Sequence, residues 1–120
     1  MSYEVAMAAL ADPTRRAILD LLRTRALCVG EMAMALPVSR PAVSQHLRVL
    51  SDAGLVTATS RGTRNFYAID PEGVAALRGY LDAMWSDALA AFAREAERAS
   101  ERGADARHPD VPPTRTGDRP

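Results

Sequence analysis

The chain has 120 residues, of which 48% are hydrophobic, 25% are charged and 5% are aromatic, and its formal net charge at pH 7 is zero. This length and composition fit one folded domain and exclude two of ordinary size, and the balanced charge excludes nonspecific binding of polyanions by the chain as a whole. We expect no membrane segment, because no apolar run approaches about 20 residues, and we expect a cytoplasmic protein, because no signal-like segment opens the chain and Cys28 is its single cysteine.

Four helices are predicted in the first half of the chain. Residues 3–10 are densely apolar, and Asp12 then provides an N-cap for a second helix with Pro13 in its first turn. The second helix has a helical period, with Ile18, Leu19 and Leu22 expected inside and Arg15, Arg16, Asp20 and Arg23 expected outside. A short third helix is predicted over residues 30–36 and ends at Pro37.

The fourth helix, predicted over about residues 39–53, has signals at both ends. Ser39 is a suitable N-cap, and Gly54 suits the left-handed position after the last turn. At about 100° per residue, Val43, Leu47 and Leu50 form one apolar stripe. The residues on the opposite face are short, polar or charged: Pro41, Ser44, Gln45, Arg48 and Asp52.

A hairpin and a long helix follow. Two β-prone runs, residues 55–59 and 65–69, flank a tip that contains glycine. Asp70 and Pro71 repeat the cap-and-proline signal and open a helix with apolar residues at every third or fourth position. From residue 103 this periodicity is lost and prolines recur, so we expect residues 103–120 to be a disordered tail.

The order of these elements predicts a mainly α (α+β) protein with about five helices and a two-stranded hairpin. Helices followed directly by a β-hairpin are the layout of a winged helix-turn-helix. We therefore expect residues 1–102 to form a single domain for DNA binding and dimerisation.

The outer face of the fourth helix suits a DNA major groove. Gln45 can pair with adenine and Arg48 with guanine or a phosphate. Residues 38–67 hold four arginines against one aspartate, and two of these arginines, Arg61 and Arg64, flank Gly62 at the hairpin tip. A polar helix face alone is also typical of simple solvation, and the local basic charge shifts the balance toward duplex binding. His46 lies about 60° from the apolar stripe, and we expect it to pack partly buried before it contacts a base.

Two stretches resemble the ArsR/SmtB-type bacterial repressors. They are residues 10–19, LADPTRRAIL, and residues 38–50, VSRPAVSQHLRVL, the latter followed by AGLV. The resemblance covers about residues 3 to 100 and implies a homodimeric repressor on double-stranded DNA. A symmetric dimer in turn predicts an inverted-repeat operator. The resemblance also implies a recognition helix (about 39–53) in the major groove and a wing (about 55–69) at the backbone or minor groove. The candidate DNA-binding residues are Ser39, Arg40, Pro41, Ser44, Gln45, Arg48, Arg61, Gly62, Thr63 and Arg64.

The long helix carries more apolar surface than a small core needs. Its stripe around Trp85 is explained either by ordinary core packing or by a two-fold interface shared with the first helix, and we expect the interface. The interface residues predicted on this basis are Val5, Ala6, Ala9, Leu81, Met84, Trp85, Ala88, Leu89 and Phe92.

The chain departs from the metal-sensing members that it resembles. Such members often carry Cys-Val-Cys on the third helix, whereas here Gly30 follows Cys28-Val29, and the last helix offers no histidine beside its aspartates. We therefore expect no metal site and no cofactor, and we expect Cys28 to be a buried packing residue rather than a sensor. No set of residues identifies an effector.

An enzyme is the weakest interpretation. The sequence has no glycine-rich phosphate loop, and two histidines and one cysteine offer little for a nucleophile and its base. The alternative to a DNA-binding regulator is a winged-helix module for protein–protein contact, which the neutral overall charge would suit.

Overall fold

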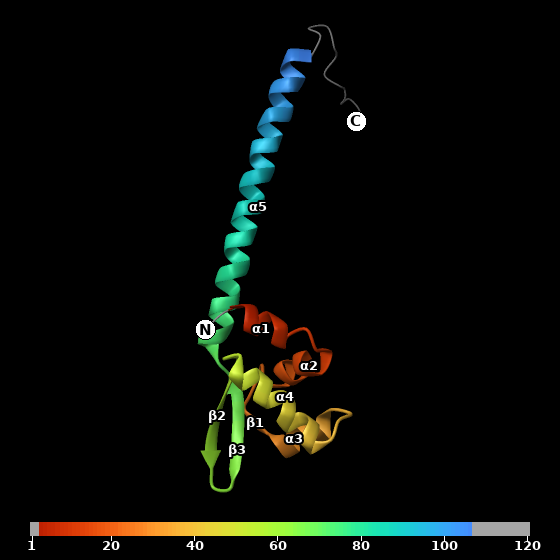
Figure 1. The fold of residues 1–120 in the computed structure, drawn as a ribbon, viewed down its shortest axis with the longest axis vertical. Helices are drawn as coiled ribbons and strands as arrows, with labels where there is room; N and C mark the ends of the chain where they lie inside the picture. The colour runs from red at the N-terminus through yellow and green to blue at the C-terminus, as the bar shows by residue number, and fades with distance from the viewer. Residues whose placement is uncertain (1–2, 107–120) are drawn as a thin grey trace, which may run out of the picture. The chain divides into compact units, whose positions relative to one another are not determined.

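The computed structural model describes residues 3–106, so the part of the predicted tail from residue 107 onward lies outside the described residues. Within this range the elements follow the predicted order, with one short strand added (Figure 1). They are α1 (Tyr3–Ala9), α2 (Pro13–Leu21), β1 (Leu27–Cys28), α3 (Val29–Ala35), α4 (Arg40–Asp52), β2 (Val56–Arg61), β3 (Arg64–Ile69) and α5 (Pro71–Ala106). Five helices with an antiparallel hairpin form the predicted winged helix-turn-helix fold.

The chain divides into two compact units, of which one ends at Asp82 and the other begins at Ala83. Helix α5 extends to Ala106, beyond the boundary at residue 102 that the sequence predicted. Residues 103–106 are helical because alanine favours the helix, whereas one glycine costs only about 1 kcal/mol. Within the described residues, no helix combines the length and apolarity needed to cross a membrane.

The three predicted caps start their helices. The Asp12 carboxylate accepts hydrogen bonds from two backbone N–H groups of α2, at 2.7 and 3.1 Å. The Ser39 hydroxyl accepts one from the first turn of α4 at 3.3 Å, and the Asp70 carboxylate accepts one from that of α5 at 3.0 Å. These side chains satisfy donors that a helix leaves unpaired at its start, which fixes where α2, α4 and α5 begin.

Two arginines of α2, both predicted to face solvent, bind carbonyl groups at the end of α1, and of the two only Arg16 is exposed as predicted. Arg15 Nε donates to the Ala9 carbonyl oxygen at 2.5 Å, and Arg16 Nη1 donates to the Leu10 carbonyl oxygen at 2.7 Å. Arg15 is half-buried, so its predicted outward position is wrong. These carbonyls lie at the C-terminal end of α1, where cations are also favoured by the helix dipole.

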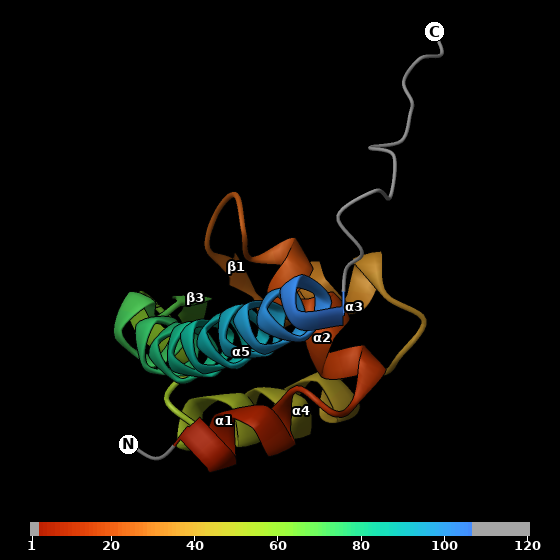
Figure 2. The same cartoon turned by 90° about the horizontal axis from the view of Figure 1, so that it is seen from above.

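The core of the first unit lies where α4 packs against α1, α2 and α3 (Figure 2). The apolar stripe predicted on α4 is confirmed, since Val43, Leu47 and Leu50 are at most 1% exposed. The other buried members of this core are Ala6, Ala9, Ile18, Leu22, Leu27, Met32, Ala53, Leu55 and Val56.

The hairpin belongs to a three-stranded antiparallel sheet in which β3 lies between β1 and β2. The added strand, β1, pairs Leu27 with Tyr67 and Cys28 with Phe66. The sequence pattern predicts only two strands, because a strand of two residues has no period of its own and depends on its distant partner. This pairing joins the base of the wing to the start of α3.

Candidate nucleic-acid interface

The outer face of α4 is open to solvent. Burial of Val43, Leu47 and Leu50 turns the opposite side of the helix outward. All six candidate DNA-binding residues at the start and along this face are exposed: Ser39, Arg40, Pro41, Ser44, Gln45 and Arg48. They combine hydroxyl, amide and guanidinium groups over about two turns, which is the donor and acceptor chemistry that base edges and phosphates accept.

The wing ends in a tight turn that brings two arginines together. Arg61 and Arg64 are directly paired across the hairpin, and Gly62 and Thr63 connect them. Gly62 has a φ of 63°, as the first central residue of a two-residue hairpin turn of type II′ requires. All four residues are exposed, and the Arg61 guanidinium lies 4.8 Å from the centre of the Phe66 ring.

The arginines of this surface are not neutralised. Among the described residues, Arg40, Arg48, Arg61 and Arg64 take part in no salt bridge. The salt bridges that the structure records lie elsewhere, as with Arg23 and Asp20 at 3.8 Å. The guanidinium groups on α4 and the wing are therefore available to an external anion.

His46 lies beside the outer face of α4 and is partly buried, as predicted. The residue is half-buried, and its Nδ1 lies 3.4 Å from Nη1 of Arg15. The pKa of the Asp12 carboxyl is lowered mainly by the hydrogen bond from the backbone N–H of Arg15, then by that from Thr14, and to a smaller extent by positive charge on His46. His46 thus links α4 to the α1–α2 corner rather than facing outward.

The apolar residues predicted for the dimer interface divide into two groups. Ala6 and Ala9 are 1% and 2% exposed in the protomer's own core, so they have no surface to offer a partner. This part of the prediction is wrong, because apolar spacing on a short helix does not tell which side covers the protomer's own core. Val5 is exposed instead, as are the predicted residues of α5: Leu81, Met84, Trp85, Ala88, Leu89 and Phe92.

The exposed apolar residues of α5 are large. Trp85 is 65% exposed and Phe92 is 73% exposed. Nearer the start of the chain, Tyr3 of α1 stacks on Tyr80 of α5 with ring centres 4.1 Å apart. Large aromatic side chains left in water are typical of a surface that a partner covers.

Cys28 is a buried free thiol, as predicted for a packing residue. Its backbone N–H donates to Glu31 Oε1 at 3.0 Å, and this hydrogen bond is the main cause that lowers the pKa of the Glu31 carboxyl. Within residues 3–106 no three His, Cys, Asp or Glu side chains are grouped as a metal site would need.

The sequence matches a family of bacterial regulators and is similar to many individual regulators. Residues 12–58 match the family described as bacterial regulatory protein, arsR family. The HTH-type transcriptional regulator Rv2034 of Mycobacterium tuberculosis is 56% identical over 93 residues, which are 78% of this chain and 87% of that protein. The transcriptional repressor SdpR of Bacillus subtilis is 36% identical over 62 residues, 52% of this chain and 69% of the repressor.

Solved structures agree with this assignment. The homodimeric winged helix-turn-helix DNA-binding domain of Mb0332 from Mycobacterium bovis, a possible ArsR-family regulator, is 33% identical with a TM-score of 0.58. The similarity covers 70% of this chain and 78% of that domain.

Proposed function

This chain belongs to the ArsR family and is a DNA-binding transcription regulator, and we propose that it acts as a homodimeric repressor on an inverted-repeat operator. Repression is the activity named for SdpR, and a homodimer is the state named for the Mb0332 domain. The residues proposed below carry this activity in the present chain.

The recognition helix in this proposal is α4. Gln45 and Arg48 read base edges in the major groove, with Ser44 beside them, because all three are exposed on the face opposite the buried stripe. Ser39, Arg40 and Pro41 lie at the start of the helix, where the backbone N–H groups and the Arg40 guanidinium favour a phosphate.

The observation that carries the proposal is the pair of arginines at the wing tip. Like charges directly opposite each other destabilise a hairpin, and neither Arg61 nor Arg64 has a salt bridge among the described residues to offset that repulsion. A DNA backbone supplies the missing negative charge. With Gly62 and Thr63 at the tip, this wing contacts the phosphates or the minor groove.

Dimerisation through the exposed apolar residues of α5 completes the proposal. A two-fold pair of protomers presents two α4 helices to successive major grooves, about 34–36 Å apart. Such spacing corresponds to an inverted repeat. Trp85 and Leu89 are proposed to lie at the interface, and Val5 of α1 is proposed as a further exposed apolar contact with the partner.

The test begins with DNA fragments recovered by the purified chain from random sequence. Arg48→Ala is then compared with Arg23→Ala, which removes the same charge from an exposed position in the turn after α2, outside the interface. We expect Arg48→Ala to weaken operator binding at least tenfold, roughly the loss of one bidentate base contact, and Arg23→Ala to change it less than about twofold. Equal effects of the two variants would contradict the proposal.

A winged-helix module for protein–protein contact remains the alternative, and no observation favours it. It predicts that Arg48→Ala leaves both DNA affinity and dimerisation unchanged. The proposal predicts loss of DNA affinity with dimerisation retained.

A further inference from the structure

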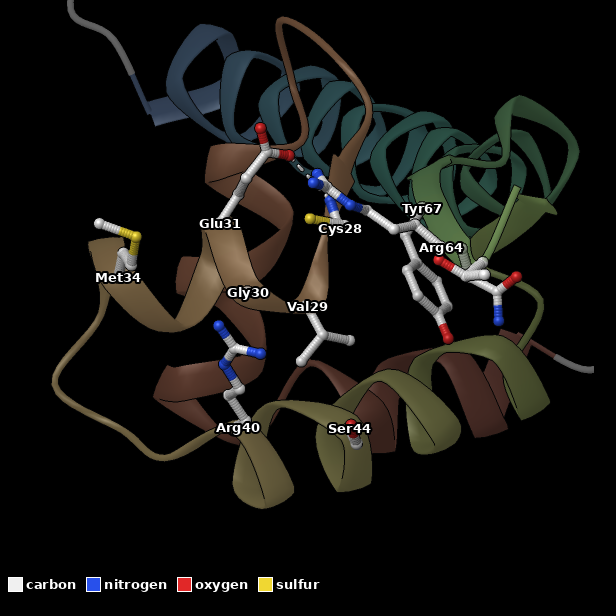
Figure 3. A pocket seen from close by; sticks show the side chains of 11 residues that line it. Cys28, Val29, Gly30, Glu31, Met34, Arg40, Ser44, Arg64 and Tyr67 are labelled. Atoms are coloured by element: carbon white, nitrogen blue, oxygen red, sulfur yellow. Dashed lines mark hydrogen bonds between the residues drawn. The ribbon is translucent and has the colours of Figure 1, made fainter. Parts of the chain in front are cut away.

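A pocket opens between the start of α3, the start of α4 and the wing (Figure 3). Its volume is about 570 Å³, within the range of roughly 300–1,000 Å³ that small-molecule sites occupy. Its lining includes the side chains of Val29, Glu31, Met34, Arg40, Arg64 and Tyr67. None of the sequence patterns pointed to this pocket, because its walls come from three separate segments.

Two cations face the pocket from opposite elements. Figure 3 shows the Arg40 guanidinium turned from α4 toward Gly30 and the Arg64 side chain extended from the wing toward the α3 side. Arg40 has room there because Gly30 lacks a side chain; a Cβ at Gly30 would lie 3.1 Å from Arg40 Nη2. Two guanidinium groups that form no salt bridge within residues 3–106 meet in one cavity, which favours an anion.

The carboxylate of the pocket does not neutralise these cations. Glu31 accepts the hydrogen bond from the Cys28 N–H at 3.0 Å, and its other oxygen lies 3.7 Å from Arg25 Nη1. The Glu31 carboxylate is thus held by its own helix start and by an arginine outside the cavity. An anion entering the pocket meets Arg40 and Arg64 without displacing an internal ion pair.

Beside the polar side chains of Ser44, Thr63 and Asn65, the pocket has an apolar wall, which a DNA phosphate does not require. Val29 and the ring of Tyr67 line the cavity, and Met34 at its rim is 88% exposed. A methionine left almost wholly in water gains stability when an apolar group covers it. The pocket is also much larger than one phosphate group.

We propose that this pocket binds a small organic anion whose charged group pairs with Arg40 and Arg64 and whose apolar body covers Met34 and Val29. Because the two arginines are also proposed DNA contacts, the bound anion competes with the operator and releases the repressor. This regulatory step rests on the proposed function, whereas binding of the anion does not. Competition follows directly from the shared residues, since a ligand shifts an equilibrium only through unequal affinity for the two states.

Phenyl phosphate is the probe, because it joins an anionic group to an apolar ring, and inorganic phosphate is its matched partner. Each is titrated into the ¹⁵N-labelled full chain while backbone amide shifts are followed. We expect saturable shifts at residues 28–34, 40–44 and 63–67, with inorganic phosphate binding about tenfold more weakly. Equal affinity for the two probes would reduce the pocket to a DNA phosphate contact and overturn the proposal, as would the absence of saturation.

Variants separate the pocket from general basic charge. Arg40→Ala and Arg64→Ala are each expected to weaken phenyl phosphate binding about tenfold. Arg61→Ala removes the same charge from the same wing but outside the pocket, so it lowers DNA affinity while leaving phenyl phosphate affinity within about twofold. An equal loss in Arg61→Ala would overturn the proposal.

Met34→Ala distinguishes failure of the pocket from failure of the proposed function. Met34 is not among the proposed DNA contacts, so this variant is expected to keep its operator affinity but to need about fivefold more phenyl phosphate for release. If the chain binds its operator and phenyl phosphate neither binds nor releases it, the pocket proposal falls and the function stands. If no operator is bound, the function falls and the amide titration still decides the pocket.

Discussion

Gly73, in the first turn of α5, lies directly against the backbone of Gly54 at the end of α4. A Cβ placed on Gly73 would overlap the carbonyl oxygen of Gly54 and lie 2.7 Å from its carbonyl carbon. Gly54 itself has a φ of 78°, the left-handed conformation that ends α4 as predicted. Close contact between these glycines joins the end of α4 to the start of α5.

The first prediction concerns this contact. Gly73→Ala is expected to lower the free energy of unfolding by about 2 kcal/mol or more, because the neighbouring atoms belong to backbone that cannot rotate away. Gly79→Ala is the matched control in the same helix, and no atom lies within 4 Å of its added Cβ. Alanine there should stabilise the protein by about 0.5–1 kcal/mol. Urea denaturation measures the free energy of unfolding of both variants, and equal changes in the two would contradict the close contact at Gly73.

The helix starts could be predicted from the sequence because their causes are local. Asp12, Ser39 and Asp70 each accept hydrogen bonds from N–H groups two or three residues ahead, so the motif and the contact coincide. The arginine contacts that close α1 were missed for the opposite reason. Arg15 reaches back six residues around a corner to Ala9, and no period or propensity encodes that path.

The second prediction uses the Asp12 cap. Hydrogen bonds from α2 hold the pKa of this carboxyl below its ordinary value, so the ionised form stabilises the fold above about pH 4. That contribution decreases as the pH falls through the lowered pKa of the folded state. Asp12→Ala should therefore lower the Tm by several degrees at pH 7 and by much less near pH 2. Thermal melts of both proteins between pH 2 and pH 7 test this expectation. A difference in Tm that stays constant with pH would contradict the role of the ionised Asp12 carboxylate.

The surface of α4 was predictable to the extent that burial fixes orientation. Once Val43, Leu47 and Leu50 face the core, Gln45 and Arg48 must face away from it. The proposed dimer residues on α1 were not predictable in this way, because Ala6 and Val5 are both apolar. Only the packing shows that Ala6 is buried while Val5 is 47% exposed. The pocket beside Gly30 depends on three segments meeting and has no signature in any of them.

The third prediction tests the apolar face of α5. Trp85→Ala should raise the dimer dissociation constant by about thirtyfold or more, as expected for a buried aromatic at the centre of an interface. Arg94 lies nine residues further, about 180° around the helix, so Arg94→Ala serves as the control with little expected change. Sedimentation equilibrium gives both constants. A monomeric native chain, or equal effects of the two variants, would remove α5 from the interface.

The fourth prediction separates base reading from phosphate contact. Gln45→Ala should reduce discrimination between the operator and a copy with one changed base pair by about 1–3 kcal/mol, because its amide is proposed to pair with a base edge. Its binding should keep the same dependence on salt, since no charge is lost.

Arg64→Ala should instead weaken binding to all sequences and reduce the slope of log affinity against log salt by about 1 per protomer, because one phosphate contact is lost. Binding measured at several salt concentrations on both DNAs distinguishes the two roles. An unchanged slope in Arg64→Ala would place this arginine off the backbone, and intact discrimination in Gln45→Ala would assign base reading to other residues of α4.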